Sequence, residues 1–271
     1  MAASQDYALG HSDGELKRLS AQARLIDPIT KRFFVSAGIA EGMRVLDVGS
    51  GAGDVALLLA GLVGPKGQVV GTDLSRGALD VAEQRIRAAG HSNVTFRHGD
   101  PALMQFDQPF DAVAGRYVLQ FIPDPSAALA KLAKHLRPGG SVVFHELDWN
   151  GARSLPPVPT YDKLCALIKR TIEQAGARTD LGGGLGAVFA QAGLADPRLR
   201  LESVIATGAA SMDVIHLVTD LAATLLPKME HFGIATASEI ALSSLAQRIF
   251  SEVGADRTLI GRAEVGAWAI V

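Results

Sequence analysis

Short runs of β-branched and apolar residues alternate with helix-like segments through the first half of the chain, and this alternation limits the fold more than any other feature. After Ser75, a good helix N-cap, apolar residues recur at helical spacing at Ala78, Leu79, Ala82 and Ile86. The five runs are 43–48, 68–73, 93–98, 111–115 and 141–147. Strand runs that alternate with helices indicate βαβ units, so the sequence predicts an α/β fold with a parallel sheet.

The second half of the chain is less regular. Residues 151–160 and 181–186 are rich in proline or glycine, and they predict loops around a helix near 161–175. The remaining predicted elements are a strand at 199–206, helices at 211–231 and 239–252, and a last strand at 264–271. Residues 1–40 predict two helices before the sheet.

Composition excludes several classes of protein. The chain has 271 residues, and its 26 Lys and Arg against 28 Asp and Glu give a net charge of −2, which argues against a nucleic-acid binder. The single Cys165 cannot form an internal disulfide, and residues 1–20 lack the pattern of a secretory signal. Apolar windows such as 55–64 are too short to span a bilayer. We therefore expect a cytoplasmic protein without a membrane segment.

The sequence VLDVGSGAGD at 45–54 places three glycines after a predicted strand and before a predicted helix. Glycines at Gly49, Gly51 and Gly53 allow a tight turn whose backbone N–H groups approach a ligand, and the helix N-terminus adds positive potential. Asp73 ends the next strand, 20 residues after Gly53, where a carboxylate can accept hydrogen bonds from two ribose hydroxyls. Asp100 follows the third strand and can meet an adenine amino group or cap a short helix at Pro101. These positions together predict a nucleotide-like ligand.

In this order of motifs, residues 40–150 resemble the class I S-adenosylmethionine-dependent methyltransferases, especially the UbiE-like small-molecule type. Segments 110–125 and 136–146 resemble the last parts of the same pattern. The resemblance implies a Rossmann-like, doubly wound sheet of seven mostly parallel strands with the last strand antiparallel. It also implies a single methyltransferase domain over 1–271, with an N-terminal helical segment at 1–40, a cofactor-binding core at 41–150, and substrate or lid insertions at 151–198 and 207–258.

The same resemblance implies S-adenosylmethionine as the cofactor and S-adenosylhomocysteine as the product. Tyr7 is included in the site because an N-terminal helix in this family commonly folds over the cofactor, and an aromatic ring attracts a sulfonium. The expected cofactor-binding residues are Gly49, Ser50, Gly51, Gly53, Asp73, Leu74, Gly99, Asp100, Pro101, Arg116, Tyr117 and Tyr7. No spacing of Asp, Glu and His residues specifies a metal site.

Two departures from related patterns refine the expected function. The G-x-G-x-G spacing differs from the G-x-G-x-x-G of nicotinamide-binding folds, and GRYVLQ at 115–120 differs from the D/N-P-P-Y type associated with methylation of planar nitrogens. We therefore expect methyl transfer to an O, N or C atom of a small molecule. Two alternatives stay open: a non-methylating S-adenosylmethionine-binding protein or cyclase, and a nicotinamide-dependent oxidoreductase.

A catalytic base is harder to predict than the cofactor site. His145, Glu146 and Asp148 lie at the end of the fifth strand, and His145 is the candidate general base. The alternative for His145 is a histidine that is packed in the strand and satisfied by its neighbours, and this reading is favoured. Apolar residues of the insertions could line an acceptor pocket, pack on the sheet or form a homodimer contact; they are Leu185, Phe189, Leu225, Leu226, Met229 and Phe232.

Overall fold

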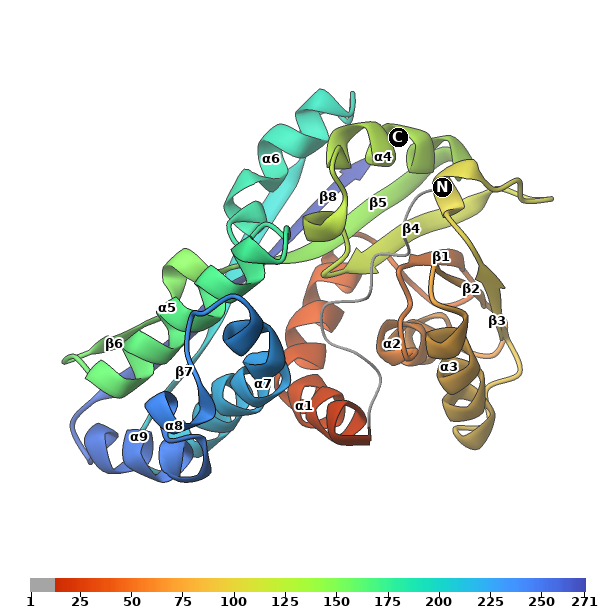
Figure 1. Ribbon diagram of the computed structural model, residues 1–271. Helices are drawn as coiled ribbons and strands as arrows, with labels where there is room; N and C mark the ends of the chain where they lie inside the picture. Colours follow the sequence, from red (N-terminus) through yellow and green to blue (C-terminus); the bar gives the residue numbers. More distant parts are fainter. Residues whose placement is uncertain (1–12) are drawn as a thin grey trace. The chain divides into compact units, whose positions relative to one another are not determined.

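The computed structural model describes the backbone of residues 13–271, and the side chains from Leu25 onward (Figure 1). The chain forms two compact units. The core unit comprises Ile26–Glu146, Leu181–Leu201 and Glu264–Val271, and the helical unit comprises Leu147–Asp180, Glu202–Ala263 and the described residues up to Leu25.

Parallel strands form the centre of the core unit. They lie in the order β3-β2-β1-β4-β5, and β8 follows β5. Their bounds are β1 (Arg44–Val48), β2 (Gln68–Asp73), β3 (Val94–His98), β4 (Phe110–Arg116), β5 (Leu136–Asp148) and β8 (Thr258–Ile270). Gly140 near the start of β5 bonds to Val271 after β8, while His145 contacts Glu264, so β8 runs antiparallel to β5. The predicted mostly parallel sheet with an antiparallel last strand is confirmed.

Helices of the core unit form where capping and apolar spacing predict them. The Ser75 side chain accepts the N–H of Ala78 at the start of α3, and Asp124 caps α4 in the same way. The helices are α2 (Asp54–Val63), α3 (Arg76–Ala88), α4 (Pro125–Leu132) and α6 (Leu181–Gln191). Buried residues such as Leu59 on α2 and Ile86 on α3 share one apolar cluster with Val45 of β1. This packing fixes both helices on the sheet, with their N-termini at the carboxyl ends of the strands (Figure 1).

In the helical unit, helices pack on one another. Its elements are α5 (Pro159–Gln174), α7 (Ser211–His231), α8 (Ala237–Ile240), α9 (Leu245–Val253), the short strand β6 (Arg153–Leu155) and most of β7 (Arg198–Thr207). β6 pairs antiparallel with the first residues of β8. In the described part of the chain, Gly208–His231 is the one segment long and apolar enough to cross a membrane. Its buried side chains, including Val214, Val218 and Leu225, belong to a helix that contacts α5 and α9, as expected for a core helix.

Four expectations from the sequence need correction. The loop predicted at 181–186 is wrong, because these residues begin α6, where burial of Leu185 and Phe189 outweighs the low helix propensity of glycine. The helix predicted at 239–252 is interrupted, because Ala241 adopts a left-handed conformation with φ 49° and separates α8 from α9.

The other two corrections concern segments outside the predicted strands. The loop predicted at 151–160 contains β6, an eighth strand in addition to the seven predicted. Instead of two helices, the described part of 1–40 contains a single helix, α1 (Asp13–Ser36). Pro28 lies inside α1 without ending it, because the buried Ile26, Ile29 and Phe33 hold the surrounding turns in the core.

Candidate functional site

The glycine turn between β1 and α2 has the backbone conformation that its sequence predicts. Gly49, Gly51 and Gly53 all have positive φ, at 67°, 51° and 89°. A Cβ added to Gly51 would meet no atom of the described residues within 4 Å, so within this part of the chain this side of the turn faces open space. The turn therefore offers backbone that a ligand can approach closely, directly before the N-terminus of α2.

Asp73 at the end of β2 is joined directly to this turn. One carboxylate oxygen accepts the N–H of Gly51 at 2.9 Å, and the other accepts the N–H of Ser75 at 2.8 Å. The side chain is only half-buried, and each carboxylate oxygen can accept a second hydrogen bond. Asp73 thus holds the turn in shape and keeps acceptor capacity for hydroxyl groups.

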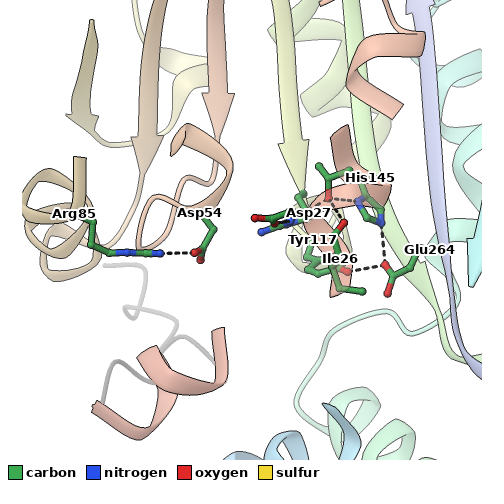
Figure 2. A network of polar contacts seen from close by, with 9 residues as sticks. Ile26, Asp27, Asp54, Arg85, Tyr117, His145 and Glu264 are labelled. Carbon is green, nitrogen blue, oxygen red and sulfur yellow. Dashed lines mark hydrogen bonds and ion pairs between the residues drawn. The ribbon is translucent and has the colours of Figure 1, made fainter. Parts of the chain in front are cut away.

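Arg85 of α3 fastens the other end of the turn, a role that the sequence did not predict. One guanidinium nitrogen donates to the carbonyl of Ala52 at 2.6 Å, and the other forms an ion pair of 2.6 Å with Asp54 (Figure 2). Both side chains are mostly buried, so solvent screens this pair less than a surface ion pair. The first residues of α2 are therefore tied to α3.

The carboxyl ends of β2 and β3 expose two large apolar side chains. Leu74 is 74% exposed, and Leu103, in the single turn after β3, is 75% exposed. The N–H of Gly99 donates to the carbonyl of Asp73, which brings these two strand ends together. The Asp100 side chain caps the turn at Pro101 by accepting the N–H of Ala102, so the capping reading of Asp100 is confirmed. Leu103 was missed, because an isolated leucine in a loop gives no signal in the sequence.

Arg116, Tyr117 and His145 belong to a second group of residues, hereafter the buried cluster. The remaining members are Asp27 and Thr30 of α1 and Glu264 of β8. Figure 2 labels Asp27, Tyr117, His145 and Glu264 of this cluster. Arg116 donates to Asp27 at 2.6 Å and to Thr30 at 3.0 Å, and the Tyr117 hydroxyl donates to Glu264 at 2.6 Å. Burial alone would lower the pKa of Arg116, but the neighbouring Tyr117 and Asp27 raise it above its ordinary value.

Both ring nitrogens of His145 are engaged inside the protein. Nδ1 lies 3.1 Å from the Thr30 hydroxyl, and Nε2 lies 2.8 Å from a Glu264 oxygen. The Thr30 hydroxyl donates to the carbonyl of Ile26, so the hydrogen between Thr30 and His145 belongs to Nδ1. A second proton must then lie between Nε2 and Glu264, which leaves this buried pair without net charge. The ring is fully buried, and this geometry supports the packed histidine over the general base.

Two further carboxyl groups lie in the interior of the core unit. Burial raises the pKa of Glu146 to about 8, although backbone N–H groups, among them those of Leu119 and Val118, act in the opposite direction. Burial likewise raises the pKa of Asp47 to about 7. The neighbouring Ser50 hydroxyl acts in the opposite direction. Both groups favour the neutral form more strongly than an exposed carboxyl group does.

The sequence did not predict Glu264, which holds both Tyr117 and His145. One signal was available: Glu264 is the only charged residue in the last predicted strand, 264–271, which is otherwise apolar. A charged residue in a buried strand usually has a partner. Of the other predicted residues, Tyr7 lies outside the described part of the chain, and Asp148 caps the turn after β5 by accepting the N–H of Asn150.

Metal chemistry and thiol chemistry have no built site in the described residues. Among the side chains described from Leu25 onward, no group of three or more His, Cys, Asp and Glu could hold a metal ion. Cys165 is buried in α5, and burial raises the pKa of its thiol to about 12, as expected for a small core residue.

Comparison with known proteins adds evidence that is independent of this geometry. A family model described as a methyltransferase domain matches residues 39–186. A demethylmenaquinone methyltransferase of Staphylococcus aureus is 36% identical over 138 residues, which are 51% of this chain and 54% of that protein. The chain therefore spans about half the length of this curated relative.

Solved structures share the fold over most of the chain. The crystal structure of the YcgJ protein from Bacillus subtilis has a TM-score of 0.54 and 20% identity, and the match covers 87% of this chain and 95% of that one. The crystal structure of the cyclase SpnF has a TM-score of 0.53 and 22% identity, with 89% and 80% of the two chains covered. At such identities the likeness shows the Rossmann-like fold alone.

Proposed function

Because the chain belongs to the methyltransferase-domain family, as the match over residues 39–186 shows, we propose that it transfers a methyl group from S-adenosylmethionine to a small molecule. The observation that carries this proposal is the pairing of the open turn at Gly51 with the carboxylate of Asp73. It joins a glycine backbone that a ligand can approach closely with an acceptor for hydroxyl groups, which suits the amino-acid and ribose parts of this cofactor.

The residues at this edge of the sheet fit the cofactor. Gly49, Ser50, Gly51 and Gly53 would hold the methionine part against the start of α2, and Asp73 would accept from the ribose hydroxyls. The exposed Leu74 and Leu103 offer apolar contact to an adenine ring, and Asp100 next to them offers a polar partner. When bound, the cofactor supplies a methyl group that its sulfonium has already activated.

This chain's own contribution to catalysis is alignment and exclusion of water. Alignment of two reactants in a dry site is worth up to about 7–11 kcal/mol. His145 cannot take a proton from an acceptor directly, because its ring is fully buried and both nitrogens have protein partners. Arg116 and Tyr117, at the end of β4, are the members of the buried cluster closest in sequence to the turn that follows that strand. Their side chains are bonded to Asp27, Thr30 and Glu264, so in this proposal they support the turn after β4 and neither contact the cofactor nor transfer a proton.

The insertions and the surroundings of the protein complete the proposal. Residues 151–198 and 207–258 would provide the acceptor pocket and lid, because these segments interrupt the methyltransferase pattern after its fifth and sixth strands. The small negative net charge supports a small-molecule acceptor and not nucleic acid. A cytoplasmic location is also part of the proposal, and the single cysteine supports it. A homodimer is part of the same proposal; of the apolar residues named for its contact, Leu226 and Phe232 are half-buried, whereas Leu185, Phe189, Leu225 and Met229 pack inside the protein.

A turnover screen tests the proposal. The protein is incubated with S-adenosylmethionine and varied phenols, carboxylates and amines, and release of S-adenosylhomocysteine is measured. The expected result is release that depends on one acceptor class. Tight S-adenosylmethionine binding without release for any acceptor would favour a non-methylating protein or cyclase, and thermal stabilisation by a nicotinamide dinucleotide alone would overturn the proposal.

A further inference from the structure

Tyr117 has an unusual backbone conformation for a residue with a side chain. Its φ is 58°, in the left-handed region that favours glycine. A residue in this region needs contacts that hold it there. Among the contacts of Tyr117 with the described residues, its N–H donates to the carbonyl of His145 at 2.9 Å, and its hydroxyl donates to Glu264 at 2.6 Å. Its ring also meets the His145 ring edge-on, with 5.2 Å between the centroids.

The residues after Tyr117 are held from the same strand. The N–H groups of Val118 and Leu119 both donate to one oxygen of Glu146, at 2.9 and 2.8 Å. Glu146 directly follows His145 on β5, so three successive N–H groups after β4 are bonded to two neighbouring residues. The backbone at 117–119 is therefore held by the hydrogen bond from the Tyr117 hydroxyl to Glu264 and by three N–H groups that donate to residues of β5.

The Val118 side chain connects this segment to the glycine turn. A Cβ added to Gly49 would lie 2.5 Å from a Val118 methyl carbon, so the Val118 side chain occupies the space beside Gly49 that another residue would fill. If Tyr117 relaxed to a negative φ, the direction of the chain would change and Val118 would leave this position. The conformation of Tyr117 is therefore coupled to the packing of the cofactor turn.

We propose that Glu264 is a positioning residue for the cofactor site, acting through the Tyr117 hydroxyl, the turn at 117–119 and Val118 on Gly49. The inference rests on the proposed function, since it assumes that the glycine turn binds S-adenosylmethionine. Tyr117 then serves the site through its backbone, and its hydroxyl is committed to a residue 147 positions later in the chain. Figure 2 shows Tyr117 and His145 converging on Glu264.

The test compares two substitutions at one position. Tyr117→Phe removes the hydroxyl but leaves a residue with a side chain that must still adopt a positive φ. Tyr117→Gly removes both the hydroxyl and the strain of a positive φ, because glycine adopts positive φ freely. Tyr161→Phe is the matched control, since the buried Tyr161 also donates its hydroxyl, to the carbonyl of Ile260, in the helical unit. Glu264→Gln keeps an acceptor for Tyr117 and is the conservative variant.

Two readouts are measured for each folded variant: hydrogen exchange of the Val118 and Leu119 amides by NMR without ligand, and S-adenosylhomocysteine affinity by calorimetry. In Tyr117→Phe, these two amides are expected to exchange faster than in the wild type, and the affinity for S-adenosylhomocysteine is expected to fall about tenfold. Tyr117→Gly is expected to stay within about threefold of the wild type in affinity, as are Glu264→Gln and Tyr161→Phe.

Different results would overturn the inference in distinguishable ways. If Tyr117→Gly loses more affinity than Tyr117→Phe, the side chain of Tyr117 contacts the ligand and the positioning role is wrong. If Tyr117→Phe lowers only the melting temperature, the contact is merely structural. If the wild type does not bind S-adenosylhomocysteine, the proposed function fails, and the amide exchange alone decides whether the Tyr117 hydroxyl holds the turn.

Discussion

The glycine turn and the buried cluster lie at the same edge of the core unit but are built in opposite ways. At the turn, Gly51 faces open space and Asp73 is half-buried, with acceptor capacity left. In the cluster, His145 and Glu264 are at most 1% exposed and bond to each other. The open region is therefore suited to bind a ligand, whereas the closed region fixes the backbone around it.

A substitution at Gly51 should block the open turn, and we expect it to cause the largest loss of ligand affinity. In Gly51→Val, a branched side chain would fill the ligand's space, and we expect S-adenosylhomocysteine affinity to fall at least about a hundredfold. Gly208→Val is the matched control, because Gly208 also has positive φ (56° against 51°) and no atom within 4 Å of an added Cβ.

Calorimetry measures the loss of affinity, and thermal melting measures the loss of stability. Both variants should lose similar stability, of order 1–2 kcal/mol for a side chain in the left-handed region, and only Gly51→Val should lose affinity. Equal affinities of the two variants would place the ligand elsewhere.

Glu146, which lies beside the buried cluster on β5 and is itself buried, predicts a dependence of stability on pH. Between the ordinary pKa of 4.5 and about 8, Glu146 is ionised in the unfolded chain and protonated in the folded one. Unfolding then releases a proton, so the stabilisation that is present below pH 4.5 is lost as the pH rises through about 8. The loss is on the order of a few kcal/mol.

Glu146→Gln should reduce this dependence. Glutamine keeps an acceptor oxygen for the N–H groups of Val118 and Leu119 and does not titrate. Urea unfolding at pH 5, 7 and 9 should therefore show a flatter profile in this variant, with a residual slope from Asp47. The half-exposed Glu83 on α3 supplies the control Glu83→Gln, which should keep the wild-type profile. A wild-type profile in Glu146→Gln would show that Glu146 is ionised in the folded protein throughout.

The smallest expected effect concerns the segments proposed as a lid. Residues 1–25, 151–198 and 211–235 should gain protection from hydrogen exchange when S-adenosylhomocysteine binds, in at least one segment. Mass spectrometry with and without the ligand measures this directly. Protection confined to residues 45–120 would show that the insertions do not respond to the cofactor.

The two regions also differ in how far the sequence predicts them. The turn was predictable, because its strand, its glycines and Asp73 lie within 30 residues and follow local rules. The cluster was not, because His145 and Glu264 are 119 residues apart and meet only through the pairing of β5 with β8. The prediction of a loop at the glycine-rich start of α6 was wrong for a related reason: the packing of Leu185 and Phe189 outweighed the local propensity of the glycines.

The central claim is that S-adenosylmethionine binds at the Gly49–Gly53 turn with Asp73 on its ribose. Calorimetric titration of S-adenosylhomocysteine into the wild type, Asp73→Ala and the control Asp80→Ala tests it most directly. Asp80 is an exposed aspartate of α3 that pairs with Arg76. Asp73→Ala should bind at least about tenfold more weakly, because each hydrogen bond to the charged group is worth about 1.5–3 kcal/mol, while Asp80→Ala should bind like the wild type. Unchanged affinity in a folded Asp73→Ala protein would contradict the account.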